Sequence, residues 1–488
     1  MKIRLIFAAA SLVAGIATLP TPLLAQTRPF ARPNVLFIAV DDLRNWLGCY
    51  GDQQAKTPHM DRLAARGVRF DRAYCGAPLC NPTRTSLITG IRPAVTGVYQ
   101  NNVKWSDAVP DAMTIPLLFK QNGYYVSGAG KITHANSVRP SDWHDFGPVQ
   151  DQYEGGEDVG NDPVGRKAQK GDTVLGKFSW HAVPNANEAS LIDYRITSYI
   201  VERLRQRRDK PFFLACGIHR PHVPWNVPQQ YFDMYPLDKV RQPTINPHDL
   251  DDVGPIGRKW ANVLNDEAIR REPQGPERVI QAYLAATSFC DAQIGRLLDA
   301  LDNSSYRDNT IIVLWGDHGW NHGEKQHWAK MVLWEESTRA PLLWIAPGVT
   351  KPGGVCERTV DFLSIFPTLC DLAGLSTPAQ CKNPSFRSLL ADPASAWDRP
   401  ALTTMGRGNH TVRDERWRYI RYSDGFEELY DHRADPLEWT NVANKPEFAE
   451  VKARLAKWLP TEDAPDKGRA VNSSVKSTPA KNRQKNKG

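Results

Sequence analysis

Short, wholly apolar runs recur along the chain and alternate with longer amphipathic stretches. An apolar run without polar alternation is typical of a β-strand buried on both faces of a sheet. Such runs occupy residues 34–40, 212–216, 310–315 and 341–346. Residues 57–66 predict a short helix that Thr57 caps, and residues 277–301 carry apolar side chains at helical spacing. Strands that alternate with helices predict an α/β sandwich: a large, mostly parallel central sheet flanked by helices.

The pattern changes near residue 392, and we expect a second, smaller unit beyond it. Residues 417–422 and 428–431 are typical of short antiparallel strands, and residues 446–459 predict a helix. The sequence therefore predicts a catalytic domain over residues 26–392. A small C-terminal α+β subdomain with an antiparallel sheet is expected over residues 393–460.

Three stretches have the composition of loops or tails. Residues 139–188 and 236–276 are rich in Gly, Pro, Asp and Asn, which predicts long loops over the sheet. Residues 461–488 contain no aromatic side chain and are dominated by Lys, Asn, Ser and Pro. This composition predicts a disordered basic tail.

The first 25 residues have the layout of a secretory signal peptide. Lys2 and Arg4 precede a short apolar stretch, and Ala25 is a small residue suited to cleavage before Gln26. The stretch is shorter than the ~20 residues that a spanning helix needs, and no later segment is apolar enough to span a bilayer. We therefore expect an exported protein, periplasmic or secreted, without stable membrane insertion.

The formal net charge of +7 says little about the folded surface, because most of it lies at the two ends of the chain. Residues 461–488 alone hold seven basic residues against three acidic ones. The body of the chain is close to neutral, so the charge does not support nucleic-acid binding. The eight cysteines of an exported chain can form disulfides, and Cys370 and Cys381, which lie close in sequence, are the expected pair.

Three of the predicted strands end in polar residues of catalytic type. These residues are Asp41 and Asp42, His219 and His222, and Asp317 and His318. In open α/β sheets, ligands bind beyond the carboxyl ends of the strands. A single Asp-Asp pair is more often a turn or a helix cap than a metal site. Three such ends together predict one pocket that holds carboxylates and imidazoles.

One further stretch combines a cysteine, a proline and an arginine: Cys80-Asn-Pro82-Thr-Arg84-Thr-Ser-Leu-Ile-Thr-Gly90. A lone cysteine is usually a small buried hydrophobe. This stretch, however, resembles the signature of type I sulfatases, in which the cysteine is oxidised after translation to formylglycine. The usual signature has Ser where this chain has Thr83.

Three more blocks resemble active-site blocks of the iduronate-2-sulfatase branch, in the same order. They are Gly130-Lys131-Ile-Thr-His134, His219-Arg-Pro-His222-Val-Pro, and Asp317-His318-Gly-Trp followed by Trp328-Ala-Lys330. The resemblance extends from Asn34 to about Tyr430. It implies an alkaline-phosphatase-like fold and a sulfuric ester hydrolase that acts on a sulfated saccharide.

The resemblance also implies two cofactors. A hydrated formylglycine at position 80, made by a separate maturation enzyme, carries two hydroxyls on one carbon: one attacks sulfur and the other expels sulfate. An unmodified thiol would form a thiosulfate that has no easy route to decompose. One divalent cation would be held by residue 80 with Asp41, Asp42, Asp317 and His318. The three carboxylates favour calcium, whereas the histidine leaves magnesium or manganese open.

Basic residues receive roles by the same resemblance. Arg84 is expected to hold the formylglycine hydrate, with His134 nearby. Lys131 and Lys330 would neutralise the sulfate oxygens as point charges. His222 is expected to protonate the leaving oxygen, with His219 as the second choice.

Substrate recognition is less well specified by the sequence. Trp105, Trp180, Arg407 and His410 fall in predicted loops that could reach the pocket rim, where Trp offers a stacking face and Arg a charge for a sulfated sugar. The sugar, the position of its sulfate and the oligomeric state stay open.

Two alternative functions remain at this stage. A phosphatase or phosphonate hydrolase of the same superfamily would share the scaffold, but commonly uses Ser or Thr with two zinc ions and more His and Asp ligands. A catalytically silent glycan-binding relative would not need the intact set of Cys80, Arg84, Lys131, His222 and Lys330.

Overall fold

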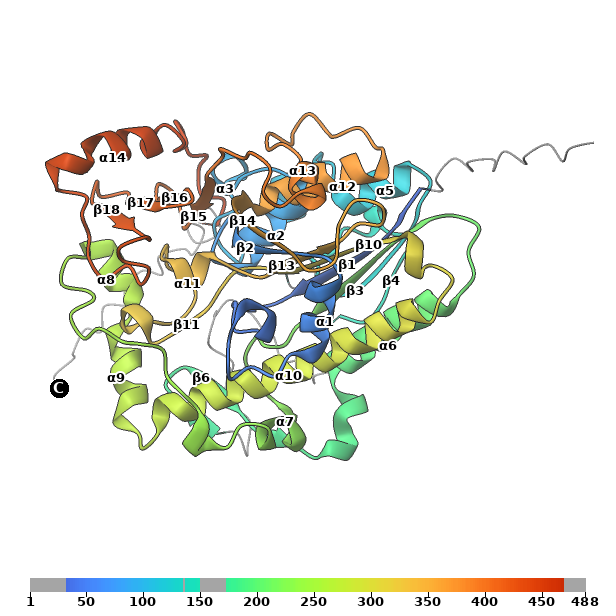
Figure 1. Cartoon of the computed structure of the whole chain (residues 1–488), viewed down its shortest axis with the longest axis horizontal. Helices are drawn as coiled ribbons and strands as arrows, with labels where there is room; N and C mark the ends of the chain where they lie inside the picture. The colour runs from blue at the N-terminus through green and yellow to red at the C-terminus, as the bar shows by residue number, and fades with distance from the viewer. Residues whose placement is uncertain (1–31, 135–136, 150–172, 469–488) are drawn as a thin grey trace, which may run out of the picture. The chain divides into compact units, whose positions relative to one another are not determined.

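An eight-stranded sheet forms the centre of the computed structural model, which describes residues 32–134, 137–149 and 173–468 (Figure 1). In spatial order its strands are β14 (Gly354–Asp361), β2 (Val68–Tyr74), β13 (Leu342–Ile345), β10 (Thr310–Gly316), β1 (Asn34–Val40), β8 (Phe212–Ile218), β3 (Tyr125–Gly130) and β4 (Asp145–Phe146). The central strand β1 pairs in parallel with β10 and with β8. The predicted large, mostly parallel sheet is confirmed.

One strand of this sheet runs against the others. β13 is antiparallel to both of its neighbours, β10 and β2. Its apolar run is similar to those of the parallel strands. An apolar run indicates that both faces of a strand are buried, but it does not indicate the direction of the strand.

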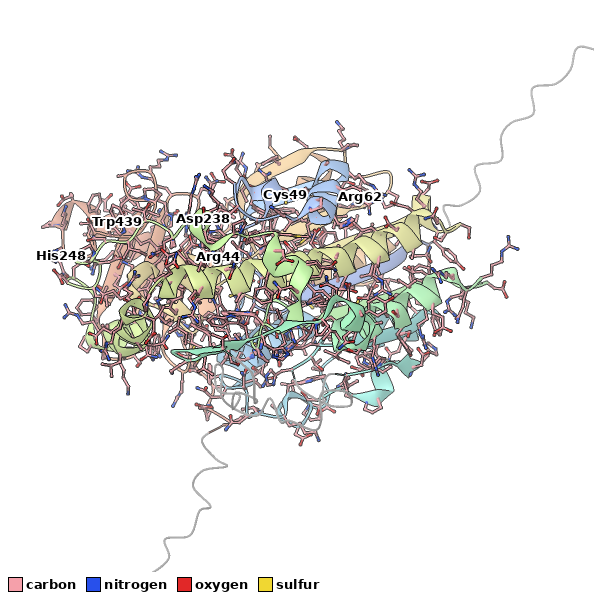
Figure 2. The ribbon with its side chains drawn as sticks, turned by 90° about the horizontal axis from the view of Figure 1, so that it is seen from below. Arg44, Cys49, Arg62, Asp238, His248 and Trp439 are labelled. Carbon is pink, nitrogen blue, oxygen red and sulfur yellow. The ribbon has the colours of Figure 1, made fainter. Side chains whose placement is uncertain are left out.

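Helices cover both faces of the sheet. Along β1, Val35, Phe37 and Ala39 pack into one core cluster, while the residues between them pack into another. This two-sided burial explains the continuous apolar run. One face is covered by α1 (Pro58–Arg66), α6 (Ile192–Arg205) and the long α10 (Gly275–Asp302), and the other by α2 (Cys80–Thr89), α5 (Ile115–Gln121) and α12 (Ile365–Ala373). The long α10 crosses the view in Figure 2, and the backbone amide of Arg44, a residue labelled there, donates to the hydroxyl group of Tyr283 in α10 at 2.9 Å.

A second sheet follows in the C-terminal part of the chain. It is antiparallel and comprises β15 (Ala401–Thr404), β16 (His410–Arg413), β17 (Trp417–Arg421) and β18 (Glu427–Asp431). Leu402, Val412 and Leu429 of this sheet pack with Leu455 of α14 (Ala449–Ala456). The predicted small antiparallel sheet with a following helix is therefore confirmed.

The expected loop over residues 236–276 is wrong in part, because it contains two helices. These are α8 (Pro255–Ala261) and α9 (Val263–Arg271), separated by Asn262 in a left-handed conformation with φ 58°. Pro255 stands at the first position of α8, where a proline is favourable because its missing N–H is not needed. The Pro and Asn residues of this stretch thus mark helix ends.

The other α-helices and strands of the described chain are short. The remaining helices are α3 (Pro93–Thr96), α4 (Trp105–Ala108), α7 (Gln229–Asp233), α11 (Glu335–Thr338) and α13 (Arg387–Ala391). The remaining strands are β5 (Thr173–Leu175), β6 (Phe178–Trp180), β7 (Ala182–Val183), β9 (Val227–Pro228), β11 (Asn321–His322) and β12 (Trp328–Ala329). β5, β6 and β7 lie in the other stretch that we expected to be a loop.

Residues 460–468, here called the C-terminal strap, also differ from the expectation. Most of this segment was predicted to belong to a disordered tail, but it packs against the chain near residues 94–108. The Ala464 amide donates to the Ala94 carbonyl at 2.7 Å, and the Lys467 amide donates to the Gly97 carbonyl at 3.1 Å. Backbone bonds hold the strap, and side-chain composition does not reveal them. The rest of the predicted tail and the predicted signal peptide lie outside the described residues.

Two further expectations concern covalent links and membranes. All eight cysteines are free thiols, so the expected pair of Cys370 and Cys381 is not formed. Within the described ranges, no helix combines the length and the apolar character that crossing a bilayer requires.

Candidate functional site

The predicted polar residues meet at one edge of the central sheet. β1, β8 and β10 are adjacent and parallel, so their carboxyl ends coincide. Asp41 and Asp42 follow β1, and Asp317 follows β10. The Asp42 amide donates to Asp317 Oδ1 at 3.0 Å, which joins the two strand ends directly. The site predicted from three strand ends is present as a single buried cluster.

Cys80 reaches this cluster from the first position of α2. Its side chain is 1% exposed. Cys80 Sγ lies 3.0 Å from Lys330 Nζ and 3.4 Å from His318 Nε2. The amino end of a helix carries partial positive charge, which favours an anionic or strongly polar group there. Burial, the largest influence, raises the pKa of the Cys80 thiol, so the thiol is neutral and a weak nucleophile near pH 7.

Arg84, one turn further along α2, bridges two of the carboxylates. Its Nε donates to Asp317 Oδ2 at 3.0 Å and its Nη2 to Asp41 Oδ1 at 3.2 Å. Asp41 also hydrogen-bonds Lys131, which follows β3. Burial opposes ionisation of Asp41, but the charges of Lys131, His222 and Arg84 outweigh it and hold its pKa well below the usual value. Asp41 is therefore a carboxylate across the physiological range.

Lys330 sits on a tightly constrained turn after β12. Ala329 and Met331, the residues on either side, have φ values of 94° and 78°, a region that residues other than glycine rarely adopt. The ammonium group hydrogen-bonds Asp42 as well as Cys80. Both ring nitrogens of His327 lie within hydrogen-bond distance of backbone carbonyls, those of Ala261 and Lys330. His327 therefore positions this turn, and the sequence analysis missed it.

Asp42 and Asp317, the other two carboxylates, are less well stabilised than Asp41. Burial, the largest cause, and the neighbouring carboxylates raise the pKa of Asp42 to about 7 and that of Asp317 to about 6. Asp42 Oδ2 is buried and has no hydrogen-bond partner among the described residues. Ligand atoms of Asp41, Cys80, Asp317 and His318 lie within 4.8 Å of one another, as do those of Asp41, Asp42, Cys80 and His222. A hard divalent cation fits this donor set, because it would satisfy the free oxygen and remove the repulsion.

Three histidines border the cluster. His222 Nε2 lies 3.8 Å from Asp42 Oδ2, while its Nδ1 lies 2.6 Å from the Val223 carbonyl. His219 Nδ1 lies 3.6 Å from Asp41 Oδ2. His134 is half-buried at the end of the segment that carries Lys131, and burial with the Lys131 charge lowers its pKa. All ten residues predicted for the site therefore fall in or beside one cluster.

A cleft of about 1680 Å³ opens beside the cluster. Leu79 and Met331 line it, and they adjoin Cys80 and Lys330 in the chain. Arg407 and His410, two of the four expected rim residues, line it as well. The other two expectations are wrong: Trp105 is buried and donates to the Ser137 carbonyl at 2.7 Å, and Trp180 packs in an aromatic core beside Trp225.

Comparisons with known proteins agree with this geometry. A family described as Sulfatase matches residues 33–375, and a family described as N-sulphoglucosamine sulphohydrolase, C-terminal, matches residues 323–464. A sulfatase from Formosa agariphila is 40% identical over 89% of this chain and 88% of its own length. Iduronate 2-sulfatase from Mus musculus is 33% identical over 72% of this chain and 71% of its own.

A solved structure supports the fold. An enzyme in complex with its substrate D-glucosamine-2-N,6-O-disulfate superposes with a TM-score of 0.69, covers 87% of this chain and 96% of its own, and is 21% identical. At that identity the likeness bears on the fold, which is the alkaline-phosphatase-like sandwich that the sequence predicts.

Proposed function

The chain belongs to the sulfatase family, and on this premise we propose that it removes sulfate from a sulfated saccharide through a formylglycine made from Cys80. The observation that carries the proposal is the place of Cys80 Sγ: it is buried 3.0 Å from Lys330 Nζ, in a cluster where Asp42 Oδ2 has no hydrogen-bond partner among the described residues. A thiol held neutral there is poorly suited to attack an anion. Formylglycine hydrate at this position supplies two hydroxyls on one carbon, one to displace the alcohol from sulfur and one to expel sulfate.

We propose that one divalent cation, most simply calcium, is held by Asp41, Asp42, Asp317 and His318 together with residue 80. Three carboxylates are a typical hard-cation set, and magnesium or manganese would also suit the histidine. When bound, the cation supplies Lewis-acid polarisation of the sulfate oxygens.

The side chains around Cys80 have separate tasks in this proposal. Lys131 and Lys330 neutralise the charge on the sulfate group. A nucleophile can then approach the sulfur in a site from which water is excluded. Arg84, already fixed by two carboxylates, orients the hydroxyl groups of residue 80. His222 gives a proton to the leaving oxygen from its Nε2; because Nδ1–H donates to the Val223 carbonyl, this step starts from the doubly protonated ring. His134 assists Arg84 and Lys131 from the side of the cluster.

The location is a proposal as well. Residues 1–25 support export by a signal peptide, which would place the enzyme in a periplasm or outside the cell. The amino-terminal sequence of protein recovered from its host tests this: Gln26 is expected as the first residue, and an unprocessed Met1 would contradict export.

A comparison of two substrates tests the function. Turnover of an aryl sulfate and of the matching aryl phosphate should favour the sulfate clearly, and a preference for phosphate would contradict the proposal in favour of the phosphatase alternative. Cys80→Ser should abolish sulfate release while leaving the fold intact by circular dichroism. Tight binding of sulfated saccharides without any turnover by fully modified protein would instead support a silent binding protein.

A further inference from the structure

The cleft beside the catalytic cluster is lined by two arginines that form no ion pair within the described ranges, Arg407 and Arg421, and of the two only Arg421 also lacks a side-chain hydrogen bond there. The C-terminal sheet and the turn before β17 carry Arg413, Arg416, Arg418 and Arg421. The first three form ion pairs with carboxylates of Glu335, Asp431 and Glu438. Arg421 alone among these four has no ion-pair partner within the described ranges, and it lines the cleft.

The reason lies in the register of the sheet. Arg421 faces Glu427 across the β17–β18 pair, the position at which a cross-strand ion pair would form. Glu427 is instead engaged by Lys452 Nζ at 2.7 Å and by the hydroxyl group of Tyr419. The guanidinium of Arg421 therefore forms no ion pair across the strands, and Arg421 lines the cleft.

Two neighbouring side chains, His410 and Arg407, hydrogen-bond the C-terminal strap. His410, opposite Arg421 on β16, lies with its Nε2 3.1 Å from Asp463 Oδ2. Arg407 Nε donates to the Asp463 carbonyl at 3.3 Å, so the strap holds this guanidinium in place. Asp463, Glu462 and Asp466 line the same cleft. Their carboxylates can accept hydrogen bonds from sugar hydroxyls.

The rest of the lining fits a sugar ring. Gln100, Asn101, Asn102 and Asn409 offer amides, and Trp260, which is partly exposed, offers an aromatic face. We propose, on the basis of the proposed function, that Arg421 determines specificity by binding a second anionic group of the saccharide, a carboxylate or a further sulfate, while the scissile sulfate occupies the cluster at Cys80. Arginine recognises either oxyanion through paired N–H donors.

Matched substrates and variants test this assignment. The substrates are a disaccharide with one sulfate ester and one carboxylate, its carboxyl-reduced form, a form with a second sulfate, and a simple aryl sulfate. Arg421→Ala should lower kcat/KM for a doubly anionic disaccharide about tenfold to a hundredfold more than for the aryl sulfate, the range expected for a hydrogen-bonded charge. Arg421→Lys should recover part of the loss, and comparison of the carboxylate and second-sulfate forms identifies the group that is read.

The control is Arg433→Ala, which removes an exposed arginine of the same subdomain outside the cleft and should leave all ratios unchanged. Equal losses on all substrates, or an equal loss in the control, would overturn the role of Arg421. If the unmutated enzyme desulfates none of these substrates, the proposed function is wrong. Calorimetry then measures saccharide binding to Cys80→Ala protein with and without Arg421→Ala, which tests the role of Arg421 separately. Arg421→Ala should weaken binding of the doubly anionic disaccharide, and unchanged affinity would overturn it.

Discussion

Two clusters of buried carboxylates with a histidine occur in the described part of the chain, and they differ in how completely the carboxylates are stabilised. One is the cluster of Asp41, Asp42 and Asp317 at the sheet edge; the other joins Glu335, Glu438 and His432. Both place ligand-type atoms within 4.8 Å of one another. Proximity of acidic groups alone therefore does not distinguish a metal site from a structural one.

The second cluster neutralises itself. Arg418 pairs with both Glu335 and Glu438, and Arg413 Nε lies 3.3 Å from Glu335 Oε2. Burial would raise the pKa of Glu438, but Arg418 and His432 outweigh it and lower that pKa to about 2. These contacts join α11 to the C-terminal sheet, and the carboxylates need no further cation.

The cluster at the sheet edge stabilises its carboxylates less completely, although Arg84, Lys131 and Lys330 equal its three carboxylates in number. There the pKa of Asp42 is raised to about 7, although Lys330 hydrogen-bonds it. Of these two clusters, the one at the sheet edge, with raised carboxyl pKa values and the unpartnered Asp42 Oδ2, is the better candidate for a cation site.

The largest expected effect is on the cluster at the sheet edge. Asp317→Asn should lower sulfatase activity about ten-thousandfold, because it removes a cation ligand and the Arg84 partner together. Elemental analysis of the purified variant should show loss of the divalent metal. Glu438→Gln is the matched control and should retain metal; metal retained by Asp317→Asn would remove the distinction between the two clusters.

Glu438→Gln should instead destabilise the fold. Removing the Glu438 charge leaves Arg418 with Glu335 as its remaining ion-pair partner and weakens a buried charge-assisted hydrogen bond, which costs about 1–3 kcal/mol. Urea titration measures the free energy of unfolding, and activity per folded molecule should stay at the unmutated level. A decrease of less than about 1 kcal/mol in the free energy of unfolding would contradict the stabilising role assigned to this cluster.

A smaller effect separates the roles within the catalytic cluster. His222→Ala should slow esters of poor leaving groups about a hundredfold more than activated aryl sulfates, because only the former need a proton on the leaving oxygen. A leaving-group series of kcat/KM values measures the difference. An identical decrease in kcat/KM across the series would show that another residue is the general acid, and His219 would be the next candidate.

The smallest effect is on acid stability. A carboxyl whose pKa is lowered on folding contributes stability above its unfolded value of about 4.5 and loses it as the pH falls toward about 2. Urea midpoints between pH 6 and pH 3 should therefore fall more steeply for the unmutated protein than for Glu438→Gln. Parallel curves would indicate that Glu438 titrates normally.

The sequence predicted the elements whose patterning is local. The apolar runs identified β1, β8 and β10, and the polar residues at their ends identified the cluster, because strand direction and burial bring those ends together. It did not predict the direction of β13, which depends on how the chain returns to the sheet. It did not predict the C-terminal strap, because backbone hydrogen bonds hold that segment. It also did not predict the role of His327, because one of its partners, the Ala261 carbonyl, is far from it in sequence.

The proposed function requires that the thiol of Cys80 become an aldehyde in the active enzyme. Mass spectrometry of the peptide containing residue 80, from active protein made in its own host, detects this change. The expected result is the mass of formylglycine or its hydrate, in an amount that rises with specific activity across preparations. An unmodified cysteine in fully active protein would contradict it.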